Sequence, residues 1–318
     1  MALWGHPIAR QMEDWWKKHA DIHDDPQWLE WLSVFKVLLD KKFIEWSEEH
    51  DNSHDGQKLF GMSGSGGCVR KASLKLLGYK PERDSGSTYF TFWLGHAVEI
   101  AALATLQLVG YPLLDTQKKL VLESELNGKV EPVMRSASDG IINILGKPTP
   151  VSVKSAAYKM SGQMKGKWIR RGFAEYPFVG VRSSNQSAYV QLQMEMYAGG
   201  YQQGLILIAS KDIVKAFEND EYLGKKGNGS LTFYTEIVKP ETEITEPVIK
   251  EFTEALSNVR NGKAHPALYL QKDTYKYIEL QKAHYTPSNI WGGPNKELTG
   301  TFNPCGGCEL RDACKSAV

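Results

Sequence analysis

Residues 136–158 read SASDGIINILGKPTPVSVKSAAY, and we expect this stretch to decide the fold. The apolar run from Gly140 to Leu145 predicts a strand, Gly146 to Pro148 predicts a turn, and Val151 to Val153 predicts a second strand. Asp139 opens the first strand and Lys154 lies where the second ends. The predicted hairpin therefore carries an acid where it begins and a lysine where it ends.

The composition is that of an ordinary soluble globular chain. The 318 residues are 42% hydrophobic and 24% charged, and the net charge is +1, so any basic surface must be local. No apolar run approaches the roughly 20 residues that a membrane span needs. The N-terminal stretch MALWGHPIARQMEDWW lacks the apolar core of a signal peptide. We therefore expect an intracellular, cytoplasmic protein without a membrane partner.

Residues 1–56 predict an N-terminal helical extension, distinct from a domain of residues 57–318. Asp25 before Pro26 is typical of a helix start. Apolar and aromatic residues then recur at spacings of three and four from Trp28 to Trp46, which predicts a stripe that packs against the body of the protein. Stacking on nucleic-acid bases is the alternative. These helices also offer a surface for a protein partner.

A second predicted helix, Phe92 to Leu108, is apolar almost all round and is therefore expected to be buried. Glu99 within it needs a metal or a lysine as a partner, because an unpaired buried carboxylate is very costly. A glutamate at the helix edge, facing water, is the alternative. His96 is expected to be structural.

The remaining patterns complete the sheet. Further strands are predicted at 117–122, 130–134, 204–210 and 231–238, with helices at 187–201 and 247–260. This order predicts an α/β fold with a central mixed β-sheet flanked by helices. The helix at 187–201 carries Gln193 and Tyr197 on one face, with Gln191 and Glu195 on a different face.

Two stretches predict contacts with phosphate. A Gly-rich loop, Gly61 to Gly67, leads into a helix with Arg70 and Lys71 near its start. The loop lacks the Gly-Lys-Ser/Thr ending of a P-loop, and a plain loop and cap is the alternative. Between 155 and 183, basic residues mixed with aromatics suit a nucleic-acid strand, with a solvated loop as the alternative. The basic residues there are Lys159, Lys165, Lys167, Arg170, Arg171 and Arg182.

The four cysteines suggest a metal centre. Cys305, Cys308 and Cys314 follow a C-x2-C-x5-C spacing, and Cys68 lies far upstream. Four thiols could hold zinc or an iron–sulfur cluster, and unrelated free cysteines are the alternative. A metal centre here would close the C-terminus onto the helix that begins at Cys68.

Together these segments resemble the RecB-type branch of the PD-(D/E)XK nuclease superfamily. The resemblance is to its iron–sulfur-containing members: the CRISPR adaptation exonuclease family, AddB-type helicase–nucleases and phage lambda-exonuclease-like relatives. It spans roughly Gly61 to Cys314 as an ordered series of short motifs. The matching positions are Cys68 and Arg70, Gly95 and Glu99, Asp139 and Gly140, Lys154, Gln193 and Tyr197, and the three closing cysteines, with Gln191 adding the Gln-x-Gln of lambda-exonuclease-like members.

The resemblance implies a restriction-endonuclease-like sheet flanked by helices, with an N-terminal helical extension and a C-terminal cysteine cluster. It implies a metal-dependent DNA nuclease, an exonuclease acting on DNA ends or single strands in recombination, repair or phage replication, in a bacterium or a phage-infected host. Mg²⁺ or Mn²⁺ would be held by Glu99, Asp139, the Val153 carbonyl and the residue at 152, and Lys154 would orient or activate the attacking water.

Further roles follow from the same resemblance. Gln193 and Tyr197 would steady Lys154 or bind the DNA backbone, and the four cysteines would hold a 4Fe–4S cluster, which the spacing alone does not separate from zinc. The residues expected to contact DNA are Arg70, Lys71, Lys165, Lys167, Arg170 and Arg171.

Position 152 departs from the family pattern. The residue two before the lysine is usually Glu or Asp, but here it is Ser152. Losing a carboxylate should weaken metal binding substantially. Three explanations compete. The acid has moved to a neighbouring helix, with Glu175 and Glu195 as candidates; Glu99, Asp139 and the Val153 carbonyl suffice, the metal keeping extra waters; or the chain is a catalytically weak or inactive DNA-binding or assembly subunit. A zinc-ribbon protein without a nuclease site is a further alternative.

Overall fold

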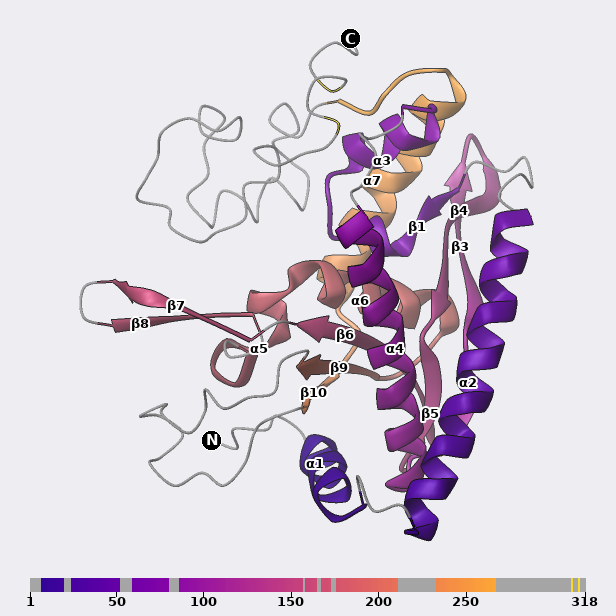
Figure 1. Ribbon diagram of the computed structural model, residues 1–318. Coiled ribbons are helices and arrows are strands. Elements are labelled where there is room, and N and C mark those ends of the chain that lie inside the picture. Colours follow the sequence, from indigo (N-terminus) through magenta and orange to yellow (C-terminus); the bar gives the residue numbers. More distant parts are fainter. Residues whose placement is uncertain are drawn as a thin grey trace.

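The computed structural model describes most of the chain (Figure 1). The described residues are 7–19, 24–51, 59–79, 86–156, 158–164, 167–172, 176–210, 233–266, 310 and 314. The helices are α1 (Pro7–His19), α2 (Pro26–Asp51), the 3-10 helix η1 (Met62–Gly64), α3 (Val69–Leu76), α4 (Gly86–Leu108), α5 (Tyr176–Ser184), α6 (Gln186–Gly199) and α7 (Thr242–Arg260). The strands are β1 (Phe60–Gly61), β2 (Leu113–Asp115), β3 (Lys118–Leu126), β4 (Lys129–Ser138), β5 (Gly140–Ile144), β6 (Lys147–Ala156), β7 (Tyr158–Met164), β8 (Lys167–Gly172), β9 (Gly204–Ser210) and β10 (Phe233–Val238).

The predicted hairpin forms the middle of a five-stranded sheet of order β10-β9-β6-β5-β2. Strands β5 and β6 pair antiparallel, β6 and β9 pair parallel, and β9 and β10 pair antiparallel. The turn differs slightly from expectation. It lies at Leu145 and Gly146, both with positive φ (53° and 80°), so β6 begins at Lys147 inside the predicted turn. The predicted central mixed sheet flanked by helices is confirmed.

A second sheet, of order β1-β4-β3, delivers the chain to Asp139. Strand β4 ends at Ser138 and β5 begins at Gly140, so Asp139 is the single residue at the crossing between the two sheets. The Ser138 hydroxyl donates to the Gly140 carbonyl (2.9 Å), which pins this corner. A Cβ on Gly140 would lie 3.0 Å from the Leu103 side chain, so the close packing of β5 against α4 favours glycine here.

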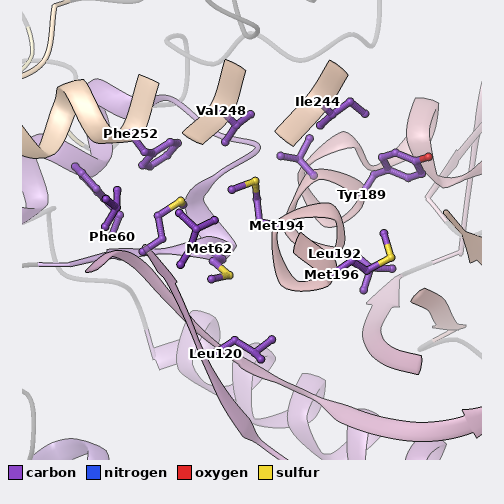
Figure 2. Packing of buried hydrophobic residues seen from close by; sticks show 14 of the residues in the cluster. Phe60, Met62, Leu120, Tyr189, Leu192, Met194, Met196, Ile244, Val248 and Phe252 are labelled. Atoms are coloured by element: carbon purple, nitrogen blue, oxygen red, sulfur yellow. The ribbon is translucent and has the colours of Figure 1, made fainter. Parts of the chain in front are cut away.

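Helices cover both faces of the five-stranded sheet. One face packs against α1 and α4, where Leu103 and Leu106 meet Val151 and Val153. The opposite face packs against α6 and shares a core with α7 and the second sheet. Figure 2 shows Met194 of α6 between Val248 of α7 and Leu120 of β3. Helix α6 is therefore enclosed, and every residue from 188 to 196 is buried.

The N-terminal helices pack against α4 through their tryptophans. Asp25 caps α2, because its side chain accepts from the Gln27 N–H (2.8 Å) and Pro26 is the first helical residue. The indoles of Trp16 and Trp31 both donate to the Thr105 hydroxyl (3.1 Å each). The expected packing of the aromatic stripe is confirmed for Trp28, Trp31, Phe35 and Leu38, whereas Leu29, Leu32 and Phe43 are exposed. The boundary between residues 56 and 57 stays a prediction.

Several elements extend beyond their predicted ends. Helix α4 begins at Gly86, and α7 begins at Thr242 with Pro247 inside it. A proline at a helix start is the commoner arrangement, which is why the sequence suggested 247. The basic stretch after β6 contains the antiparallel ribbon β7–β8, which projects from the body in Figure 1. No helix in the described part of the chain is long and apolar enough to cross a membrane.

Candidate active site

The hairpin brings Asp139 and Lys154 together. Lys154 Nζ lies 4.0 Å from Asp139 Oδ2, and the same oxygen accepts from the Val153 N–H at 2.7 Å. The carboxylate is thus held over β6 by a backbone donor beside the lysine. This pairing is local, because a short hairpin requires only that β5 and β6 lie side by side.

Glu99 of α4 is buried, with three partners. Lys42 Nζ lies 3.5 Å from Glu99 Oε1, the Gln117 side-chain amide donates to the same oxygen at 3.1 Å, and His96 Nδ1 lies 3.2 Å from Oε2. The lysine that the sequence predicts for a buried Glu99 therefore comes from α2. Lys42 was not identified from the sequence as this partner. Lys42 follows Leu38 by four residues and so lies on the packed stripe, where a lysine is unusual and could have indicated a buried acidic partner.

Glu195 of α6 contributes a third buried carboxylate. Its exposed fraction is 1%. Its Oε1 accepts from the Ser136 hydroxyl and from the Gln191 side-chain amide, both at 2.8 Å. Its Oε2 is buried without a hydrogen-bond partner among the described residues. The face of α6 that carries Gln191 and Glu195 is therefore turned toward β4, close to where β4 reaches Asp139.

The charges of these groups act on one another. The pKa of Asp139 is raised to about 7: burial is the main cause, the charge of Lys154 opposes it, and the charges of Glu99 and Glu195 add to it. Burial also raises the pKa of Glu195, against the hydrogen bonds from Gln191 and Ser136 and the charge of Lys154. The positive charge of Lys154 therefore acts on the pKa values of three carboxylates, those of Glu99, Asp139 and Glu195.

Glu99 differs from the other two acids. Burial works to raise its pKa, but the hydrogen bond from His96 and the charges of Lys42, His96 and Lys154 outweigh burial, so the pKa is lowered. Glu99 is therefore held ionised at neutral pH, whereas the pKa of Asp139 lies close to neutral pH.

Ser152 lies on the face of β6 that looks onto α6. It pairs with Ile206 and Lys154 pairs with Ile208. Both isoleucines belong to the core that contains α6, whereas Val151 and Val153 belong to the core on the other side. Ser152 is 0% exposed, and its hydroxyl has no hydrogen-bond partner among the described residues.

The structure does not bring Gln193 or Tyr197 to Lys154 through any described contact. Gln193 is 0% exposed, donates to the Lys239 carbonyl and accepts from the Glu241 N–H, each at 2.9 Å. Tyr197 is 52% exposed. The expected catalytic roles of both residues stay predictions.

Cys314 lies at the start of α3. Cys68 caps this helix, and Arg70 in its first turn donates to Cys314 Sγ (3.2 Å), to the Cys314 carbonyl (3.0 Å) and to the His265 carbonyl (2.7 Å). Arg70 is only 7% exposed, so its described contacts are with the C-terminal tail, and its expected phosphate contact stays a prediction. Cys305 and Cys308 lie outside the described residues.

The other expected DNA contacts are partly described. Lys71 follows Arg70 in α3 and is half-buried. Lys167, Arg170 and Arg171 belong to β8, whose backbone pairs with β7. Lys165 and the alternative acid Glu175 lie outside the described residues.

The acids are of the donor type that binds a hard divalent cation, but their side chains are not placed closely enough to share one. Carboxylate oxygens are the donors that Mg²⁺ and Mn²⁺ prefer. Within the described part of the chain, Glu195 Oε2 and Ser152 Oγ are buried without hydrogen-bond partners, which is the state that an added cation or its water would relieve. Within the described residues, no three His, Cys, Asp or Glu side chains are close enough to share an ion as placed. Binding would require side-chain movement.

Comparison with known proteins finds distant structural likenesses. No family model matches the chain, and no curated protein matches its sequence. The crystal structure of SSO0001 is similar over 78% of this chain and 95% of that one, at 15% identity and a TM-score of 0.42. A phage-related exonuclease from Haemophilus somnus 129PT is similar over 60% and 78%, at 16% identity and a TM-score of 0.35. LHK-Exo, crystallised with dAMP, is similar over 70% and 98%, at 12% identity and a TM-score of 0.34.

Proposed function

We propose that this chain is a divalent-metal-dependent DNA nuclease of the PD-(D/E)XK kind, an exonuclease that acts on DNA ends or single strands in recombination, repair or phage replication. The observation that carries the proposal is the field around Lys154. Asp139 lies 4.0 Å from this lysine, and the positive charge of Lys154 acts to lower the pKa values of the buried acids Glu99 and Glu195. Burying several acids near one lysine lowers the stability of the fold, so a functional role explains them better than a structural one. Such a group of residues suits phosphodiester hydrolysis.

Each residue then has a chemical task. A bound Mg²⁺ or Mn²⁺ supplies a Lewis acid that offsets charge on the reacting phosphate. Glu99 and Asp139 would hold the ion, with the Val153 carbonyl beside Asp139 as a further oxygen donor. Lys154 would orient the attacking water and offset negative charge on the phosphate. The Val153 N–H keeps one Asp139 oxygen aimed at this position.

The substrate is proposed to be DNA because a basic ribbon continues from the strand that carries Lys154. Strand β6 ends at Ala156 and β7 begins at Tyr158. Lys167, Arg170 and Arg171 follow on β8, with Lys165 in the connection. A projecting basic ribbon beside the acids suits a polyanion that must be tracked along its backbone. The exposed Leu29, Leu32 and Phe43 on α2 support a protein partner at the N-terminal helices.

Replacing Lys154 by methionine tests the activity. Wild-type protein with Mn²⁺ or Mg²⁺ should shorten end-labelled linear DNA, single- or double-stranded, and leave covalently closed circles intact. Lys154→Met should lower the rate by about 100-fold or more, because it removes a charge from the reacting centre. The measurement is release of labelled nucleotides at saturating metal.

Lys147→Met is the matched control, because Lys147 is exposed at the start of the same strand and should leave the rate unchanged. If wild-type protein binds DNA but cuts no substrate with either metal, the second candidate, an inactive DNA-binding or assembly subunit, takes its place. Ser152 is the observation that favours that candidate. The inactive-subunit candidate would be established if the wild type cuts no DNA and if both the wild type and Lys154→Met bind DNA.

We also propose that Cys68, Cys305, Cys308 and Cys314 hold a structural 4Fe–4S cluster. The return of Cys314 to Arg70, two residues after Cys68, supports a shared centre at the start of α3. Elemental analysis of anaerobically purified protein should give iron with a broad visible absorbance band. Zinc without iron would instead favour a zinc centre.

A further inference from the structure

Helix α6 packs on the face of β6 that carries Ser152, and it contains a buried acid, Glu195. By alternation along β6, the Ser152 and Lys154 side chains share the face that packs on α6. Glu195 lies on α6, and its charge and that of Lys154 act on each other. Glu195 and Ser152 thus lie on two elements that pack against each other on the side of β6 that carries Lys154.

The two hydrogen bonds of Glu195 both go to one of its carboxylate oxygens, and the other oxygen accepts none from the described residues. Ser136 and Gln191 both donate to Oε1, which fixes the carboxylate. Oε2 and the Ser152 hydroxyl are both buried without partners in the described part of the chain. A purely structural glutamate would be expected to satisfy both oxygens, because a buried carboxylate oxygen without a donor is costly.

Resting on the proposed nuclease function, we propose that Glu195 is the third acid of the metal site and replaces the carboxylate absent at position 152. Asp139 and Glu99 supply the other carboxylates. Ser152 has a much smaller side chain than the usual Glu or Asp, and with a shift of its side chain Glu195 Oε2 would reach the ion from α6. This differs from an arrangement in which Glu99, Asp139 and the Val153 carbonyl suffice.

Mn²⁺ binding to Glu195→Gln is the decisive measurement. Glutamine keeps an oxygen for Ser136 and Gln191 but loses the charge. Mn²⁺ affinity, followed by titration calorimetry and by the paramagnetic resonance of free Mn²⁺, should fall by about 10- to 100-fold. The metal-free variant should unfold at a higher temperature than the wild type, because an uncompensated buried charge has been removed. A merely structural glutamate would give the opposite shift.

Returning the acid to the strand is the complementary test. The double variant Ser152→Glu with Glu195→Ser should recover most of the Mn²⁺ affinity that Glu195→Gln loses. Ser152→Glu alone should lower stability, because it adds a further buried acid. This pair decides the question even if Glu195→Gln folds poorly. Glu246→Gln, an exposed change on α7, is the matched control and should leave affinity unchanged.

The outcomes separate this inference from the function on which it rests. If Asp139→Asn weakens Mn²⁺ binding while Glu195→Gln and the double variant bind as the wild type does, Glu195 is not a ligand and the nuclease proposal stands. If Asp139→Asn and Glu195→Gln both leave Mn²⁺ binding unchanged, the proposed metal site itself fails.

Discussion

At the scale of single residues, the acids around Lys154 are held in different protonation states. Glu99 has a lysine, a histidine and an amide as partners and is held ionised. Asp139 has one backbone donor and a lysine at 4.0 Å, and burial raises its pKa to about 7. Of these two acids, Asp139 is therefore the one whose ionised form is disfavoured near neutral pH.

The raised pKa of Asp139 predicts how stability depends on pH. Its folded-state pKa of about 7 exceeds the usual 3.8, so the folded chain binds this proton more tightly than the unfolded chain. The stabilising contribution is complete below about pH 4 and is lost as pH rises through about 7. In metal-free protein, the free energy of unfolding should therefore fall between about pH 5 and about pH 8, as measured by denaturant titration.

Two comparisons check this pH dependence. Asp139→Asn should flatten the decline, whereas Asp115→Asn, an exposed change at the end of β2, should keep it. Mn²⁺ should stabilise the wild type more at the upper end of the range, because the cation favours the ionised acid. The raised pKa of Glu195 acts in the same direction, and the lowered pKa of Glu99 matters only at more acidic pH. A stability that rises with pH across this range would contradict the assignment.

At the scale of elements, α6 serves two sides of the molecule. Gln191 and Glu195 face the acids, whereas Gln193 bridges Lys239 and Glu241 and so fixes the connection from β10 to α7. Because residues 188–196 are all buried, each polar side chain on this helix needs a partner of its own.

Replacing Gln193 by alanine separates a structural from a catalytic role. The change leaves the Lys239 carbonyl and the Glu241 N–H without their partner, so the free energy of unfolding should fall by about 2–4 kcal/mol. Denaturant unfolding measures this, and Gln202→Ala, an exposed change after α6, should cost little. Unchanged stability with a large loss of DNA cleavage would instead assign Gln193 to the reaction.

At the scale of the whole molecule, Arg70 joins segments that are far apart in the sequence. It donates to His265 and to Cys314, which is 244 residues away. Burial and the charge of Arg70 lower the pKa of His265 to about 4, so this histidine is neutral where it packs near the tail. The guanidinium thus anchors the returning chain to α3.

Arg70→Met should loosen that closure. Three charge-assisted hydrogen bonds are lost, so we expect the free energy of unfolding to fall by about 2–4 kcal/mol and the tail to become a site of limited proteolysis. If the cysteine centre is as proposed, iron per chain should fall as well. Lys75→Met, an exposed change on the same helix, should alter none of these. Weakened DNA binding with stability and iron unchanged would instead support the phosphate contact expected for Arg70.

Short-range sequence patterns account for the local structure of this protein. The hairpin that places Lys154 beside Asp139, the cap at Asp25, the buried strand β9 and the helical faces all follow from short-range periodicity and turn residues, which act within a few positions of the chain. The same patterns, taken in order, were enough to predict the mixed sheet flanked by helices, because strand and helix order restricts the ways in which layers can pack.

The face of α6 that lies toward the acids is set by the packing of the helix in the folded protein. A helix buried all round carries no apolar stripe to orient it, so the sequence could separate Gln193 and Tyr197 from Gln191 and Glu195 but could not tell which pair lies near Lys154. The contacts of Lys42 with Glu99 and of Arg70 with Cys314 could not be predicted from the sequence either. These contacts join distant segments whose meeting depends on the packing of the whole core, which no local pattern records.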